Sequence, residues 1–150
     1  MIEKIKVRKL KKGDFKKGFF ESLSNLFKVG LSVKEAGKIF ERIRRNPTYH
    51  IFVAEINNEI VGVTTLLVEQ KFLLKGAVFG YIEDVAVRKG FERRGIGKLL
   101  VKTAIKEADK EGCAKLRLDC SEENAPFYEK CGFYKKKALR MQLDLRKISV

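Results

Sequence analysis

The sequence predicts a single α/β domain built on a mixed, mostly antiparallel sheet of about six or seven strands, flanked by about four helices. Two observations lead to this fold class. The chain has 150 residues, which is the length of one ordinary domain. Apolar residues recur at helical spacing over residues 14–45 and alternate with polar ones directly afterwards. Both patterns then alternate along the rest of the chain, so we expect the strands to form one sheet and the helices to pack on it.

The first third of the chain predicts one strand and two helices. Residues 2–10 alternate apolar and basic side chains, as a half-buried strand does. Residues 14–28 carry phenylalanine and leucine at helical spacing. The run Ser-Val-Lys-Glu at 32–35 is a capping box that begins a second helix, which ends near Arg45 before Pro47.

The remaining chain predicts a strand-rich half. Strands at 49–56 and 59–69 form a hairpin around two asparagines, and a third strand covers 78–87. We then expect the following elements, in order: a helix at 95–111, a strand at 114–120, a short helix over 124–131 and final strands between 133 and 145.

The charge balance points to an anionic ligand. The chain has 33 Lys and Arg residues against 19 Asp and Glu residues, a formal net charge of +14. Such a protein attracts nucleic acid, membrane phosphate or small phosphorylated ligands. No apolar run approaches the roughly 18 residues of a membrane span, and the N-terminal residues lack the apolar stretch of a signal peptide. We therefore expect a cytoplasmic protein with no membrane partner.

Cysteine and histidine usage excludes several kinds of site. The three cysteines, Cys113, Cys120 and Cys131, have no CxxC spacing, so we expect neither a disulfide framework nor a metal site. We expect Cys120 to be a small buried residue rather than a nucleophile. His50 is the one histidine, which excludes sites that need two, and we expect it to be structural.

Three segments are candidates for chemistry. The glycine turn at 91–98 follows a strand and precedes a helix. Its backbone N–H groups could form an anion-binding site, or the turn could be an ordinary tight connection. It matches neither a P-loop nor a dinucleotide fingerprint.

Glu83 and Asp84 interrupt an apolar strand, so at least one carboxylate should point into the core, unless the strand ends at a solvated edge. In the segment 118–128, an acidic residue at a strand end precedes a polar turn and a helix. Such polar groups suit a binding crevice, or Asn124 only caps the helix and Tyr128 only packs.

Together these segments resemble the GNAT superfamily of N-acetyltransferases, and they are similar to the eukaryote-type glucosamine-6-phosphate N-acetyltransferases. The resemblance is carried by GYIEDVAV at 80–87, GIGKLL at 95–100 and GCAKLRLDCSEENAPFYEKCGF at 112–133, and it extends over nearly the whole chain. It implies acetyl-CoA as co-substrate, lying in a splay between the fourth and fifth strands. It also implies a homodimer that completes the acceptor site across its interface.

The resemblance assigns roles to individual residues. It implies that backbone groups of the fourth strand pair with pantetheine, and that the glycine turn holds the pyrophosphate. The implied cofactor-binding residues are Val85, Ala86, Val87, Arg93, Arg94, Gly95, Ile96, Gly97, Lys98 and Asn124. Backbone N–H groups near Asp84 would stabilise the oxyanion, and Tyr128 would protonate the departing thiolate. Glu83, Asp84 and Asp119 would orient the amine or take up its proton.

The sequence departs from this family at several positions. Glu92 stands where a Gln or Arg usually begins the glycine motif, and Tyr81 stands where relatives often have His. Polar contacts to the sugar phosphate are replaced at Phe27 and at Asp144. We expect Lys71, Lys28 or Arg146 to hold the phosphate instead.

Two other functions stay open from these residues. One keeps the fold and cofactor but acetylates another small amine or a protein amine. The other is a nucleic-acid-binding protein on this scaffold, which the charge favours but which lacks a helix-turn-helix or an aromatic-basic platform.

Overall fold

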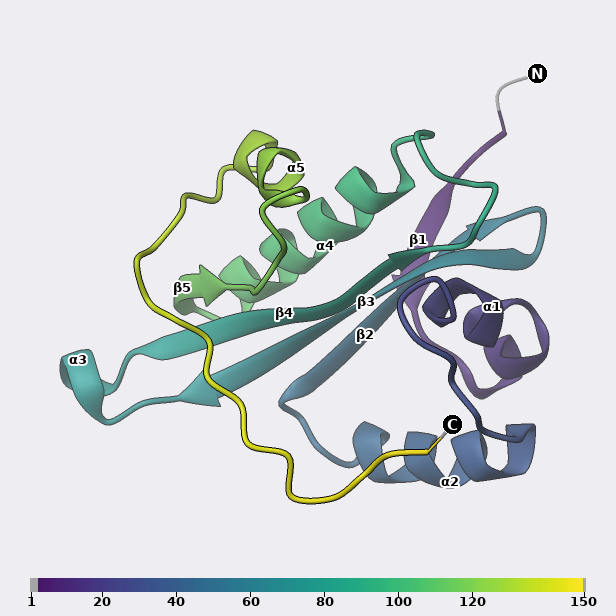
Figure 1. The fold of residues 1–150 in the computed structure, drawn as a ribbon, viewed down its shortest axis with the longest axis horizontal. Coiled ribbons are helices and arrows are strands. Elements are labelled where there is room, and N and C mark those ends of the chain that lie inside the picture. The colour runs from purple at the N-terminus through teal and green to yellow at the C-terminus, as the bar shows by residue number, and fades with distance from the viewer. Residues whose placement is uncertain (1–2, 150) are drawn as a thin grey trace.

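The computed structural model describes residues 3–149 and confirms the α/β class (Figure 1). The strands are β1 (Lys6–Lys9), β2 (Tyr49–Ile56), β3 (Glu59–Gln70), β4 (Val78–Val87) and β5 (Cys113–Arg117). The helices are α1 (Phe19–Leu23), α2 (Val33–Arg44), α3 (Leu73–Gly76), α4 (Ile96–Lys110) and α5 (Ala125–Lys130), with a 3-10 helix, η1 (Lys12–Lys16), before α1.

The strands form one sheet in the order β1-β2-β3-β4-β5. Every neighbouring pair is antiparallel except β4 and β5, which run parallel. The turn between β2 and β3 places Asn57 and Asn58 at φ 49° and 66°, as a tight hairpin turn requires. The mixed, mostly antiparallel sheet is therefore confirmed, although within the described residues it has five strands rather than six or seven.

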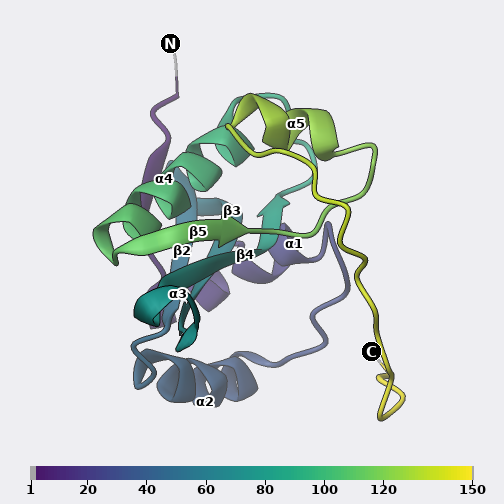
Figure 2. The same cartoon turned by 90° about the vertical axis from the view of Figure 1, so that its left-hand side faces the viewer.

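The sheet is covered on both faces. α4 lies against one face, and η1, α1 and α2 lie against the other (Figures 1 and 2). Alternation along β2 divides the core accordingly: Val53 packs with Phe15 and Phe19, whereas Ala54 packs with Ile96 and Leu100 from α4. The second view shows β5 and α5 at the same side of the molecule as α4 (Figure 2).

The predicted helix over 14–28 is interrupted at Gly18. This glycine has φ 105°, in the left-handed region, and separates η1 from α1. A Cβ atom there would lie 2.5 Å from the carbonyl oxygen of Ile60, so the chain passes too close to β3 for any other residue. The helix at 33–44 does begin at the predicted capping box, in which Ser32 and Glu35 bond each other's backbone N–H groups.

The predicted final strands between 133 and 145 are wrong for this chain. The described part of the segment after α5 contains no strand and runs clear of the sheet (Figure 2). The alternating residues Leu139, Met141, Leu143 and Leu145 are 78–89% exposed. An alternating pattern forms a strand only where another strand supplies hydrogen-bond partners, and no strand within residues 3–149 pairs with this segment.

No helix among residues 3–149 combines the length and the apolar character needed to cross a membrane.

Candidate active site

A bulge in β4 shapes the centre of the site. Val63 pairs with Ala86 and Thr65 pairs with Glu83, so Thr64 alone opposes both Asp84 and Val85. Asp84 takes φ 52°, a strained value for a residue that is not glycine. Both Glu83 and Asp84 are exposed, so neither carboxylate is buried in the core, contrary to expectation, although Asp84 borders an apolar cavity on the α1 and α2 side of the sheet.

Beyond the bulge, β4 separates from β5. The parallel pairing between them runs from Val78 with Cys113 to Tyr81 with Arg117 and ends there. Within the described chain, residues 82–87 of β4 have β3 on one side and no strand on the other. The edge of Val85, Ala86 and Val87 thus offers backbone groups to an extended ligand, in the manner of an added strand.

The glycine turn leads from β4 into α4. Gly90, Arg93 and Gly95 all have positive φ, and Gly95 begins α4 without any side-chain cap. The first N–H groups of a helix have no partner inside it, so those of Ile96 to Lys98 face outward at the positive end of a 15-residue helix. This end suits a phosphate group.

Glu92 strengthens the turn. Its carboxylate accepts a 2.6 Å hydrogen bond from the backbone N–H of Gly90 and a 3.4 Å bond from the side chain of Asn25. Hydrogen bonds from its own backbone and from that of Gly90 lower the pKa of Glu92 below its usual value. Glu92, the residue that departs from the family pattern, therefore stabilises the backbone of the glycine turn.

Three carboxylates converge beside the bulge. Partial desolvation raises the pKa of Glu83, the charges of Asp84 and Asp119 raise it further, and Arg140 lowers it. Asp119 follows β5, and its Oδ2 atom lies 3.7 Å from Nη1 of Arg140 in the C-terminal segment. The structure thus brings together the three acids singled out in the sequence and adds Arg140, for which the sequence offered only its nearness to Asp144.

Tyr128 lies on α5, the helix that follows the loop carrying Asp119. Its ring packs edge-on against Phe127 at 4.9 Å and Phe133 at 6.2 Å. Desolvation, followed by the neighbouring Cys120 and Cys131, raises the pKa of Tyr128 to about 12. The phenol therefore keeps its proton at neutral pH and can donate it.

Two predictions about the same region have different outcomes. Asn124 precedes α5 but makes no side-chain capping bond, so capping does not occupy its amide. Cys120 is exposed, and the expectation that it is buried is wrong, because β5 ends at Arg117 and Cys120 lies in the loop beyond.

The lysines expected to hold a phosphate lie away from the carboxylates. Lys71 forms an ion pair of 2.6 Å with Glu69 and sits over the ring of Phe79, toward the opposite end of β4. Lys28 is exposed in the loop between α1 and α2. Neither forms an ion pair with Glu83, Asp84 or Asp119 within residues 3–149.

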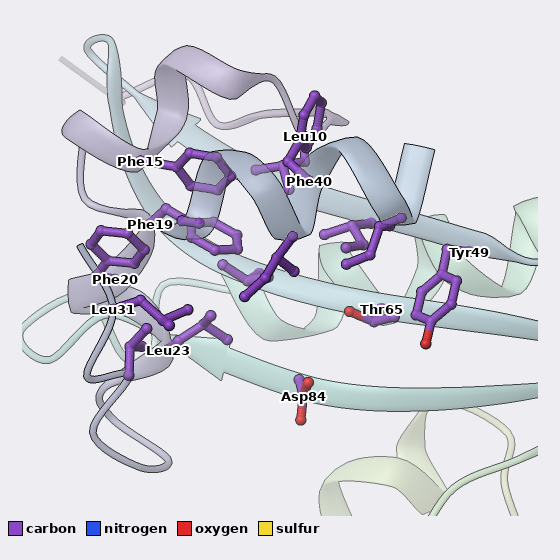
Figure 3. A pocket seen from close by; sticks show the side chains of 16 residues that line it. Leu10, Phe15, Phe19, Phe20, Leu23, Leu31, Phe40, Tyr49, Thr65 and Asp84 are labelled. Carbon is purple, nitrogen blue, oxygen red and sulfur yellow. The ribbon is translucent and has the colours of Figure 1, made fainter. Parts of the chain in front are cut away.

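An apolar cavity of about 210 Å³ lies between the sheet and α1 and α2. Figure 3 shows phenylalanine rings gathered at one end and Asp84, Thr65 and Tyr49 at the other. Asp84 is the one charged residue that lines it. The cavity therefore borders the bulge through Asp84.

The comparisons with known proteins agree with this geometry. A sequence model described as the acetyltransferase (GNAT) family matches residues 17–133. A glucosamine 6-phosphate N-acetyltransferase of Arabidopsis thaliana is 37% identical over 140 residues, which is 91% of this chain and 94% of that protein. One from Dictyostelium discoideum is 33% identical over 144 residues, covering 94% and 91%.

A solved structure gives the same result. The crystal structure of glucosamine-6-phosphate N-acetyltransferase from Arabidopsis thaliana superposes with a TM-score of 0.91 at 36% identity, over 96% of this chain and all of that one. The bulge, the splayed strands and the uncapped start of α4 lie within a fold that the two proteins share over 96% of this chain. This chain therefore belongs to the acetyltransferase (GNAT) family of acetyl-CoA-dependent acyltransferases.

Proposed function

We propose that this protein transfers the acetyl group of acetyl-CoA directly to the primary amine of glucosamine 6-phosphate. The observation that carries the proposal is the cluster of Glu83, Asp84 and Asp119 with Arg140 at the splay of β4 and β5. Three acids attract an ammonium group and a nearby arginine attracts a phosphate. The names of the relatives supply the identity of an acceptor that carries both groups.

The cofactor would lie along the open edge of β4. Val85, Ala86 and Val87 would bond the pantetheine arm, and Asn124 would contact it from the start of α5. The N–H groups from Arg93 to Lys98 would hold the pyrophosphate, with the side chains of Arg93, Arg94 and Lys98 adding positive charge.

The transfer needs a neutral amine. Glu83 is suited to accept the ammonium proton, directly or through water, because its raised pKa makes it a better base than an ordinary glutamate. The freed amine attacks the thioester carbonyl carbon, and the N–C bond forms as the C=O becomes an oxyanion. The bulge releases backbone N–H groups near Asp84 and Val85 from the β3 ladder, and these would stabilise that oxyanion.

Collapse of this intermediate breaks the C–S bond. The departing thiolate takes the proton of the Tyr128 hydroxyl, which desolvation has kept protonated. The second amine proton leaves through the carboxylates to water, and Tyr128 regains a proton from solvent. No group on the enzyme becomes acetylated.

The proposal includes a homodimer. Four exposed apolar side chains alternate along the extended segment that carries Arg140, so a second copy would bury them and fix this arginine beside Asp119. Sedimentation velocity tests the assembly: we expect twice the chain mass of 17.2 kDa. Leu143→Lys with Leu145→Lys should give monomers, whereas Gln142→Lys, on the other side of the alternation, should not. A monomeric wild type would overturn this part.

The apolar cavity favours a second candidate. An amine attached to an apolar group could place that group among the phenylalanine rings and its ammonium at Asp84. This acceptor needs no phosphate contact.

Release of CoA, measured by thiol titration, tests the proposal. The protein is incubated with acetyl-CoA and glucosamine 6-phosphate, glucosamine, spermidine, phenethylamine or a lysine peptide, and the enzyme's own exposed Cys120 is subtracted in a blank. We expect saturable release with the phosphorylated sugar and a product heavier by one acetyl group. Release with another amine alone would reject the acceptor and keep the family.

A further inference from the structure

A cluster on the face of the sheet opposite the apolar cavity contains His50, Glu107 of α4 and Glu111, the residue directly after α4. His50 Nδ1 lies 3.3 Å from Oε1 of Glu107, and its Nε2 lies 3.7 Å from Oε1 of Glu111. The two glutamates are four residues apart, so α4 presents both on one side toward β2. One nitrogen and one oxygen from each carboxylate lie within 4.8 Å of one another.

The imidazole is buried and only partly satisfied. His50 is 9% exposed, and its Nε2 atom has no hydrogen-bond partner among residues 3–149. Buried polar atoms in folded proteins are nearly always paired. An unpaired ring nitrogen that faces a carboxylate at 3.7 Å is therefore positioned for a ligand that binds both groups.

The charges of the cluster point to a cation. The chain has 33 basic residues. In the part that the structure describes, neither Glu107 nor Glu111 forms an ion pair with a lysine or arginine, and His50 contacts both carboxylates. The side chain of Glu107 is 13% exposed, so a cation bound here would meet a carboxylate that is largely withdrawn from water.

We propose that His50, Glu107 and Glu111 bind a Zn²⁺ ion that fastens β2 to α4. One imidazole with two carboxylates is a mixed nitrogen and oxygen set that suits zinc, whereas Mg²⁺ and Ca²⁺ take oxygen ligands alone. Zinc donors stand about 3.4 Å apart in a tetrahedron, so the cluster must contract slightly. Glu111, whose side chain is 38% exposed, can rotate to do this and leaves the fourth position to water.

The site would be structural. It involves none of the residues proposed for acetyl transfer, and it joins the C-terminal end of α4 to the sheet while the glycine turn lies at the other end. Its presence or absence is therefore separable from the acceptor and from the transfer chemistry.

Isothermal titration of tag-free protein with ZnCl₂ tests the proposal. We expect saturation at one ion per chain, and a melting temperature that rises by about 5–10 °C at a hundredfold excess of free zinc over its Kd. Glu107→Gln and Glu111→Gln should each weaken binding by about tenfold or more. Asp109→Asn removes an exposed carboxylate of the same helix and should leave binding unchanged.

Three outcomes would overturn the site. The first is no saturable binding, with a melting temperature that does not change when zinc is added. The second is wild-type affinity in both glutamate variants. The third is binding lost only in Cys113→Ser, since this thiol lies close enough to Glu111 for the carboxylate to raise its pKa.

Discussion

Nη1 of Arg140 lies 3.7 Å from Oδ2 of Asp119, although α5 separates the two residues along the chain. Through this contact the C-terminal segment reaches the acids at the splay of β4 and β5. Arg140 is also the group that lowers the pKa of Glu83, against desolvation and two neighbouring carboxylates that raise it. The arginine therefore influences both the charge of the site and the proton affinity of its candidate base.

Arg140→Gln should move the acidic limb of the pH profile of kcat/KM to higher pH. The base acts only when ionised, so activity is present above its pKa, and loss of Arg140 raises that pKa. Lys147→Gln, which removes an exposed charge from the same segment, should leave the limb in place. An unmoved limb in Arg140→Gln would exclude Glu83 as the titrating base.

Tyr128→Phe should lower kcat by about a hundredfold to ten-thousandfold, the usual contribution of a general acid. The ring keeps its contacts with Phe127 and Phe133, so thermal unfolding should stay close to wild type. Tyr134→Phe, at a position 77% exposed, is the matched control and should turn over normally. Unchanged kcat in Tyr128→Phe would assign the proton to another donor.

Cys120→Ser should retain turnover. The thiol is exposed near Tyr128, where it could be mistaken for a nucleophile, but direct transfer needs no acetylated residue. Intact-protein mass spectrometry after mixing with acetyl-CoA alone should find no added acetyl group at this position. A large loss of kcat together with an acetyl adduct in the wild type would replace direct transfer by a two-step mechanism.

Asp14→Asn should destabilise the fold by about 3 kcal/mol, because it breaks a buried pair with Arg8 whose atoms lie 2.8 Å apart. Burial raises the pKa of Asp14, but hydrogen bonds from Arg8 and the backbone of Lys11 outweigh it and leave the pKa lowered. A lowered carboxylate pKa stabilises the fold above the ordinary value of about 3.9 and loses this effect as pH falls through the folded value.

Urea unfolding at pH 7 and pH 3 measures this. The difference between wild type and Asp14→Asn should be largest at pH 7 and shrink at pH 3. Glu41→Gln, which removes an exposed partner of Arg44, should leave the midpoint unchanged. A constant difference at both pH values would mean that packing, rather than charge, accounts for the loss.

Local patterns predicted the elements whose causes are local. The capping box at Ser32 and the alternation in β2 depend on neighbouring residues, and both elements have the expected bounds. The break at Gly18 depends on the carbonyl of Ile60, 42 positions away, and no local pattern contains it. The C-terminal alternation was interpreted as strands, but a strand needs a partner that this chain does not place there.

The site follows the same division. The sequence itself singled out Glu83, Asp84 and Asp119, and the family resemblance added their expected roles and that of Tyr128. The bulge at Asp84 depends on its register with Thr64 and could not be predicted from β4 alone. The cysteine spacing and the lone histidine predict no metal site, and the zinc site at His50 stays a proposal. The spacing of Glu107 and Glu111 on one helix was the available signal, and only the fold shows that it faces His50.

The ratio of kcat/KM for glucosamine 6-phosphate to that for glucosamine tests the proposed function most directly. Charge-assisted contacts to a phosphate should give a preference of about tenfold to a hundredfold for the phosphorylated sugar. Arg140→Gln should reduce that ratio, and Lys147→Gln, at an exposed position of the same segment, should leave it unchanged. Equal values for the two sugars, or a higher value for glucosamine, would contradict the proposed acceptor.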